Sequence, residues 1–199
     1  MLTPQILIGV AILKSGSTAL AIAWFLASRL AYMGFAAFTL RRAPLPEDGV
    51  PREVRDATWR RFSKRISWFM DNDAVAICTL VVATRGTLDV GMPLWVAIVT
   101  GAGLCVIGIT VKTWAGAHLP EGSYHWRDFF VPEETHFSAS GPYRFFANPM
   151  YTLGYAHAYG VALAWLSFHG VLAAAFAQAT ILALNAFVEQ PHFRRTHEL

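Results

Sequence analysis

Long apolar runs alternate with short polar or charged segments along the chain. Three of these runs, Thr18–Leu40, Ile66–Thr84 and Pro93–Val111, each hold roughly the 20 residues that a helix needs to cross a bilayer. A fourth run, Met150–Glu189, is about twice that length, and His169-Gly170 offers a natural break within it. The pattern predicts an all-α, polytopic transmembrane bundle of about five membrane helices. Four spans plus a re-entrant piece is the alternative.

The N-terminal segment Met1–Leu13 is apolar but too short to cross a membrane alone. It either extends the first span past Ser15-Gly16-Ser17 or forms a partial helix in the membrane. We therefore expect residues 1–199 to form a single integral membrane domain.

Composition strengthens the membrane interpretation. Apolar residues make up 55% of the chain and charged residues only 15%, against roughly 25% charged residues in soluble domains. Both cysteines, Cys78 and Cys105, lie in apolar runs, so we interpret them as small buried hydrophobic residues and not as a disulfide or metal pair.

Basic residues gather in alternate connections. The segment 41–65 is strongly basic, and Lys112–Asn148 and the C-terminal tail carry most of the remaining Lys and Arg, whereas the opposite connections offer only Arg85. By the positive-inside rule, these basic connections face the cytoplasm. We expect a multi-pass membrane protein with its C-terminus in the cytosol, in the inner membrane if the source is bacterial.

The connection Trp114–Asn148 is long and rich in aromatic residues, as functional lids are. It contains His118 and His125 together with Asp128, but no thiolate or regular His/Glu pattern that would hold a metal, so we expect none. The segment is either an amphipathic interfacial stretch or a contact surface for a substrate head group.

The junction Ser140–Tyr151 carries the first candidate binding site. Asn148 is a favourable N-cap and Pro149 suits the first helical position, so we expect a helix to begin there. A helix N-terminus can hold an anion such as a carboxylate, and Arg144 could add a bidentate grip. Simple helix capping, with Arg144 on lipid phosphates, explains the same residues.

Glu189 is the second candidate. It lies at the end of the last apolar run, before Pro191, where the helix dipole disfavours an acid. It could bind an ammonium group. An interfacial ion pair with Arg194 or Arg195 is the alternative.

Two further features lie within apolar runs. Gly101-Ala-Gly103 forms a small-residue face with Gly108, which usually serves close helix packing. Arg29 and the segment 71–73 place charges inside runs, where Arg29 could snorkel or pair across helices.

Together these residues resemble the phosphatidylethanolamine N-methyltransferases, within a superfamily that includes the isoprenylcysteine carboxyl methyltransferases. The resemblance covers about residues 93–195, half of the chain. It is carried by Asn148-Pro-Met-Tyr151, Glu189-Gln-Pro-His192, Gly101-Ala-Gly103 and Gly122-Ser-Tyr-His-Trp126. This sequence has Gln190 where the family commonly has a second acid. It has Ala147-Asn148-Pro149 where the superfamily often has Arg-His-Pro, and Asn-Pro favours the phospholipid branch.

The resemblance implies a membrane methyltransferase that uses S-adenosyl-L-methionine, with residues 93–195 as its catalytic half. Gly101 and Gly103 would let the cofactor approach a helix backbone. Arg144 and the Asn148-Pro149 helix start would hold its carboxylate, and Glu189 its amino group or ribose. The other implied cofactor-binding residues are Tyr143, Tyr151, Gln190 and His192.

The implied acceptor is the head-group amine of phosphatidylethanolamine or its methylated intermediates, with the head group near His118, Tyr124 and Trp126. The amine must lose a proton, and the candidate bases are Glu189, His125 and Asp128. The implied partner is a membrane phospholipid, and we expect no nucleic acid. Two alternatives stay open: methylation of another membrane acceptor such as an isoprenylcysteine carboxylate, and a non-catalytic lipid-binding protein.

Overall fold

The computed structural model describes residues 3–134 and 140–196, and these form an all-α bundle without strands. Four helical segments are long and apolar enough to cross a bilayer: Thr18–Leu40, Arg52–Ala83, Leu94–Gly116 and Phe168–Thr196. Their large apolar side chains include many that are exposed, for example Trp95 and Val99, which suits a surface in contact with lipid. The bundle character predicted from hydropathy is confirmed, with four long spans.

The first two helices are separate elements. Helix α1 (Pro4–Ser15) ends at Gly16, whose φ of +68° is a conformation that glycine adopts without strain, and its N–H bonds to the Leu13 carbonyl. The Ser17 side chain then caps α2 (Thr18–Leu40) by accepting from the Leu20 N–H at 3.3 Å. The described part of the Met1–Leu13 segment is thus a partial helix of its own and does not extend the first span.

Helix α3 (Arg52–Ala83) begins fourteen residues before the predicted apolar span, because hydropathy marks only its lipid-compatible part. Polar contacts join it to α2 in the middle of both helices. Arg29 forms a buried ion pair with Asp73, and the Asn72 side chain donates to the Ser28 hydroxyl at 2.6 Å. The interpretation that Arg29 pairs across helices is confirmed.

Helix α4 (Leu94–Gly116) packs closely on the short helix α5 (Ala156–Ala164). A β-carbon at Gly101 would lie 2.5 Å from the Gly160 carbonyl oxygen, and one at Gly108 would lie 2.3 Å from the His157 nitrogen. The small-residue face therefore serves backbone approach between these two helices.

The predicted pair of spans within Met150–Glu189 needs correction. Helix α5 has only 9 residues, which at about 1.5 Å per residue is too short to cross a bilayer. A turn and a short 3-10 helix, Leu153–Tyr155, precede it. The long span is instead α6 (Phe168–Leu184), which continues through a π-helical turn, Asn185–Glu189, into α7 (Gln190–Thr196). The predicted break at His169-Gly170 falls just inside the start of α6.

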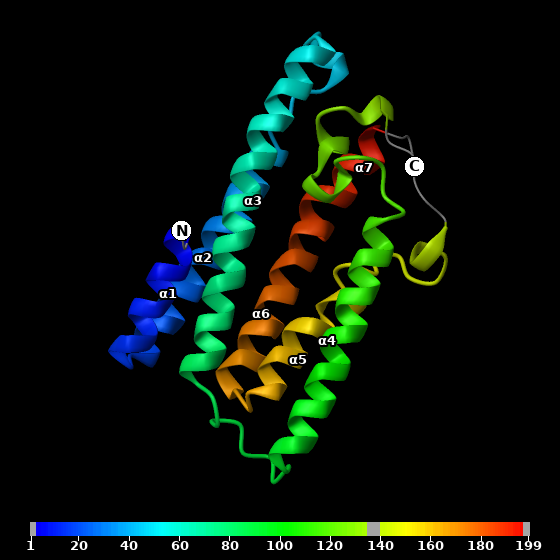
Figure 1. The fold of residues 1–199 in the computed structure, drawn as a ribbon. Coiled ribbons are helices and arrows are strands. Elements are labelled where there is room, and N and C mark those ends of the chain that lie inside the picture. The colour runs from blue at the N-terminus through cyan, green and yellow to red at the C-terminus, as the bar shows by residue number, and fades with distance from the viewer. Residues whose placement is uncertain (1–2, 135–139, 197–199) are drawn as a thin grey trace.

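The helices run side by side, and the connections alternate between the two ends of the bundle (Figure 1). The 41–51 loop, the 117–134 segment and α7 lie at one end, and the loops before α4 and α6 lie at the other. The 117–134 segment and α7 therefore lie at the same end of the bundle as the charged beginning of α3.

Candidate functional site

The long connection after α4 folds back onto the bundle. Four short 3-10 helices span Ser123–His125, Arg127–Phe129, Pro132–Glu134 and Gly141–Arg144, and the side chains of Phe129, Phe130 and Val131 are buried. Residues 135–139 lie outside the described part of the chain. Residues 117–134 cover the end of the bundle as a packed cap.

The beginning of α3 holds this cap in place. The Arg55 guanidinium donates to the Phe130 carbonyl at 2.8 Å and to the Glu133 carboxylate at 3.0 Å, and it is 4% exposed. The Trp59 indole N–H donates to the His125 carbonyl at 3.1 Å, and Arg127 pairs with Asp56 at 3.1 Å. The part of α3 that hydropathy did not mark thus anchors the cap.

Glu189 lies at the centre of the site and is 6% exposed. Its Oε1 accepts from the Trp126 indole N–H at 2.7 Å and from the Tyr151 hydroxyl at 2.9 Å. Its Oε2 accepts from the Asn185 amide at 2.8 Å. Three donors from three segments compensate the burial of this carboxylate. Among the described contacts, Glu189 forms no ion pair with Arg194 or Arg195.

Two local distortions make this arrangement possible. The π-helical turn Asn185–Glu189 brings the two side chains of its end residues together, and such turns are frequent at functional sites. Trp126 adopts a φ of +54°, which is rare for a bulky residue, and its indole reaches Glu189.

A cavity of about 400 Å³ opens beside Glu189. This volume lies within the range of sites that hold a small ligand, roughly 300–1,000 Å³. It is bounded by the cap, the turn before α5, the π-helical turn and side chains from within α2, α3, α4 and α6. The predicted site residues that line it are Tyr124, Trp126, Asp128, Tyr143, Asn148, Tyr151, Glu189 and Gln190.

Asp128 is the least satisfied acid in the cavity. Its Oδ1 is buried and accepts no hydrogen bond from any described residue. Burial raises the pKa of Asp128 to about 6; hydrogen bonds from its own backbone N–H and the Ser123 side chain act in the opposite direction, and the nearby Glu189 charge adds to the rise. A carboxylate with a free oxygen and a raised pKa is suited to accept a proton or to bind a cation.

The other two candidate bases differ from Asp128. Glu189 already accepts three hydrogen bonds. His125 is not among the residues that line the cavity, and its Nε2 lies 3.1 Å from the Ser67 hydroxyl. Burial lowers the pKa of His125.

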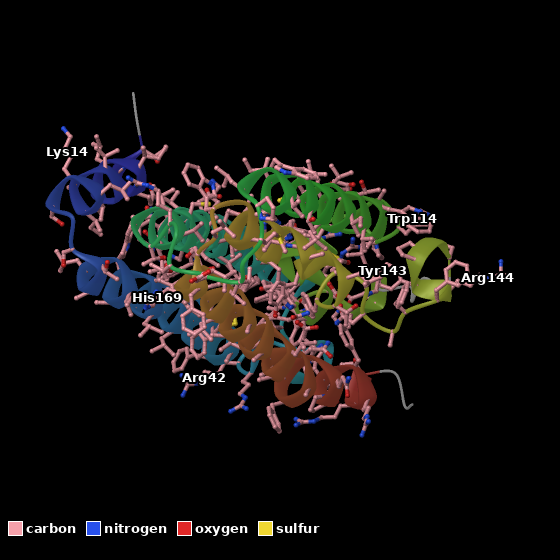
Figure 2. All side chains as sticks on the ribbon, turned by 90° about the horizontal axis from the view of Figure 1, so that it is seen from below. Lys14, Arg42, Trp114, Tyr143, Arg144 and His169 are labelled. Atoms are coloured by element: carbon pink, nitrogen blue, oxygen red, sulfur yellow. The ribbon has the colours of Figure 1, made fainter. Side chains whose placement is uncertain are left out.

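Several predicted site residues lie away from the cavity. Arg144 is exposed and reaches away from the bundle, with its guanidinium 5.9 Å from the Phe145 ring (Figure 2). His192 stacks on Phe129 with ring centroids 4.0 Å apart, and His118 contacts the Trp114 carbonyl at 2.8 Å.

The glycine prediction is not supported by the geometry either. Gly101 faces α5, as described above, and a β-carbon at Gly103 would meet nothing within 4 Å. Neither residue lines the cavity. In this structure the pair serves helix packing and a lipid-facing surface.

The predicted helix start at Asn148-Pro149 needs correction. Asn148 does accept from the Tyr151 N–H at 3.2 Å, as a capping residue would, but a turn follows and α5 begins only at Ala156. Pro149 is buried and lies outside the cavity lining. No helix N-terminus therefore points at the cavity from this position, although the Asn148 side chain remains in its wall.

Sequence reasoning missed several cavity residues. Asn185 carries a sequence signal, since it is an amide in an apolar run one turn before Glu189. Tyr32 and Tyr155 carry no comparable signal, because only the fold brings them to the cavity.

Comparison with known proteins identifies the class. The phospholipid methyltransferase family model matches residues 96–198, just over half of the chain. The chain therefore belongs to the phospholipid methyltransferase family.

Relatives named phosphatidylethanolamine N-methyltransferase are similar over 70% of this chain. Those of Arthroderma benhamiae and Podospora anserina are 27% identical over 142 and 147 residues, and that of Aspergillus clavatus is 29% identical over 145 residues. The chain spans only about 15% of the length of these relatives. No solved structure matches.

Proposed function

We propose that this protein is a membrane methyltransferase that uses S-adenosyl-L-methionine to methylate the head-group amine of phosphatidylethanolamine or its methylated intermediates. The observation that carries this proposal is the cavity beside Glu189. It lies within the family-matched region and contains a buried carboxylate oxygen of Asp128 that no described residue satisfies.

The residues present fit the cofactor. It carries a sulfonium and an ammonium, and Glu189 and Asp128 give the cavity wall two acidic groups for positive charge. Tyr143, Asn148 and Gln190 offer hydroxyl and amide groups for its carboxylate and ribose. The Arg144 side chain points away from the bundle and so does not contribute to this set.

When bound, S-adenosyl-L-methionine supplies a methyl group that its sulfonium charge already activates. The protein therefore has to align the acceptor, exclude water and remove one proton. Asp128 accepts the proton of the head-group ammonium through its free Oδ1. Trp126, Tyr151 and Asn185 hold the Glu189 carboxylate in place, and the cap anchored by Arg55 shields the site from water.

We propose that the site faces the cytoplasm. The cavity lies at the end of the bundle that also carries Arg41, Arg42 and the basic start of α3, as the positive-inside rule requires for a cytoplasmic face. The protein would then be a multi-pass membrane protein whose cofactor arrives from the cytosol and whose lipid arrives through the bilayer.

Lipid mass spectrometry tests the proposal. The protein is expressed in a host that lacks methylated phospholipids, together with an Asp128→Asn variant of equal abundance. We expect mono-, di- or trimethylated phosphatidylethanolamine with the wild type and a strong loss with the variant. Unchanged host lipids with folded wild-type protein that binds S-adenosylhomocysteine would point to another acceptor and contradict the proposal.

A further inference from the structure

A second cavity of about 320 Å³ adjoins the first. The two share Tyr32, Met70, Lys112, Tyr124 and Tyr155 in their walls, so they meet at the inner end of the site. The second cavity extends from there between α2, α3, α4, α5 and α6, in the middle of the bundle. Nothing in the proposed chemistry at Asp128 and Glu189 accounts for it.

This second cavity contains a buried ion pair that is only partly satisfied. Arg29 and Asp73 have side chains 5% and 6% exposed, and the guanidinium Nη2 of Arg29 donates to Oδ2 of Asp73. Nε and Nη1 of Arg29 donate to no described residue, and Oδ1 of Asp73 accepts from none. Buried donors without acceptors are costly, and charged residues inside a membrane bundle frequently mark a ligand path.

Lys112 adds a second cation at the junction of the cavities. Its ammonium lies 5.4 Å from the centre of the Tyr155 ring, and Lys112 and Arg29 both line the second cavity, where their positive charges repel each other. No ion pair joins Lys112 to a carboxylate within the described ranges. An anion between Lys112 and Arg29 would replace this repulsion by two attractions in a medium of low dielectric constant.

The acidic residues on either side of Lys112 restrict the ligand further. Asp128 and Glu189 lie in the first cavity, beyond Lys112, where they favour a cation. Asp71 and Asp73 also line the second cavity, and their negative charge makes a ligand that is only an anion unfavourable there. A ligand with a phosphate at the junction and an ammonium toward Asp128 matches this order of charges.

The second cavity also reaches the surface of the bundle on the membrane side. Ala74 and Cys78 of α3 line it and are themselves exposed. Both positions lie within the apolar part of α3, so this opening faces lipid and not the aqueous end of the bundle. Acyl chains could leave the cavity there while the head group stays inside.

We propose that Arg29 and Lys112 hold the phosphodiester of the acceptor phospholipid at the junction of the two cavities, with the acyl chains leaving past Ala74 and Cys78. The inference rests on the proposed function for the identity of the acceptor. It adds a phosphate subsite in α2 and α4, formed in part by the first half of the chain, which the family model does not match.

The test measures lipid and cofactor binding separately on the purified full chain in detergent. Short-chain phosphatidylethanolamine is titrated into the wild type and the Arg29→Lys and Lys112→Met variants, with Lys14→Met as a control. Arg29→Lys keeps the charge that pairs with Asp73 but removes the additional guanidinium donors. The control residue lies on α1, away from both cavities (Figure 2).

Hydrogen bonds to charged groups contribute roughly 1.5–3 kcal/mol, so we expect each site variant to weaken lipid binding by about tenfold or more. Lys14→Met should bind lipid as the wild type does. S-adenosylhomocysteine affinity should stay unchanged in Arg29→Lys, because Arg29 does not line the first cavity. Wild-type lipid affinity in both site variants would overturn the phosphate subsite even if methyl transfer were demonstrated.

Two further titrations separate the possible outcomes. Inorganic phosphate and glycerophosphoethanolamine are titrated as soluble probes, and we expect both to bind far more weakly than the lipid. Equal affinity for a soluble probe would overturn the lipid assignment. If the wild type binds the lipid through Arg29 and Lys112 but never binds S-adenosylhomocysteine, the proposed methyl transfer fails while the phosphate subsite stands.

Discussion

The Tyr151 hydroxyl donates a hydrogen bond of 2.9 Å to Oε1 of Glu189, across 38 residues of sequence. This contact joins the turn before α5 to the π-helical end of α6. It also explains why Asn148 and Glu189, at opposite ends of the apolar segment 150–189, share one cavity. Tyr151 itself is braced by Gln178, whose side-chain amide donates to the Tyr151 carbonyl at 3.1 Å.

Tyr151→Phe removes one of the three donors to Glu189 and leaves the ring in place. We expect a loss of roughly 1 kcal/mol in stability and weaker cofactor binding, because the carboxylate loses part of its compensation. Thermal unfolding and titration with S-adenosylhomocysteine measure both effects. Thr58→Val is the control, since the Thr58 hydroxyl bonds to the Val54 carbonyl of its own helix and lies outside the cavity. An equal effect of both changes on cofactor binding would contradict a specific role for Tyr151.

Asp128 gives the reaction its expected pH dependence. The base must be ionised, and burial raises the pKa of Asp128 to about 6, so activity should fall as the pH drops through about 6. In Asp128→Asn, residual activity should be much lower and should lack this acidic limb. Rates measured from pH 5 to 8 on saturating substrate check the prediction. An acidic limb that persists unchanged in the variant would assign the proton transfer to another group.

The same pKa shift has a consequence for folding. The pKa of Asp128 is higher in the folded state than its usual value of about 4, so the folded state binds the proton more tightly. This contribution to stability is present below about pH 4 and is lost as the pH rises through about 6. Asp128→Asn should therefore be more stable than the wild type at pH 7, and thermal unfolding at pH 5 and pH 7 should show the difference shrinking at the lower pH. A variant less stable than the wild type at pH 7 would contradict the unfavourable burial of this carboxylate.

Arg55 should control the order of the cap. Arg55→Ala leaves the Phe130 carbonyl and the Glu133 carboxylate without their donor, so the segment 122–131 should open more readily. Hydrogen–deuterium exchange in this segment should accelerate. Arg61→Ala is the matched control, because Arg61 is exposed on the same helix and makes no described contact with the cap. Equal exchange in the two variants would show that Arg55 does not anchor the cap.

The glycines of α4 separate packing from cofactor binding. Gly101→Ala would force a methyl group against the Gly160 carbonyl oxygen and should cost roughly 1–3 kcal/mol in stability. Gly103→Ala meets open space and should leave stability unchanged or slightly improved. Unfolding midpoints and S-adenosylhomocysteine titrations of both variants make the comparison. Loss of cofactor binding in a stable Gly103→Ala protein would restore the role that the family resemblance implies.

The sequence predicted the parts of the fold that depend on hydropathy and on local charge. The spans in Thr18–Leu40 and Pro93–Val111 follow from apolar runs of sufficient length. Glu189 stands out as an acid placed where lipid and the helix dipole disfavour it; the structure places its carboxylate in the cavity wall, and its role stays a prediction. The Arg29 pairing followed from the cost of a lone charge in such a run.

What the sequence did not predict depends on tertiary contacts. The start of α3 at Arg52 is polar, and its role as an anchor is visible only when Arg55 and Trp59 meet the cap. Asn148-Pro149 has the residues of a helix start, yet the contact between Tyr151 and Glu189 holds this segment as a turn. The separation of Arg144 from the cavity likewise depends on how residues 140–148 fold back.

Calorimetric titration of S-adenosylhomocysteine into the purified wild type and a Glu189→Ala variant tests the central claim most directly, with Glu47→Ala as an exposed acidic control. The account predicts saturable binding by the wild type and the control, and none by folded Glu189→Ala protein at millimolar ligand. Wild-type affinity in Glu189→Ala, or no binding by the wild type itself, would contradict the assignment of this cavity to the cofactor.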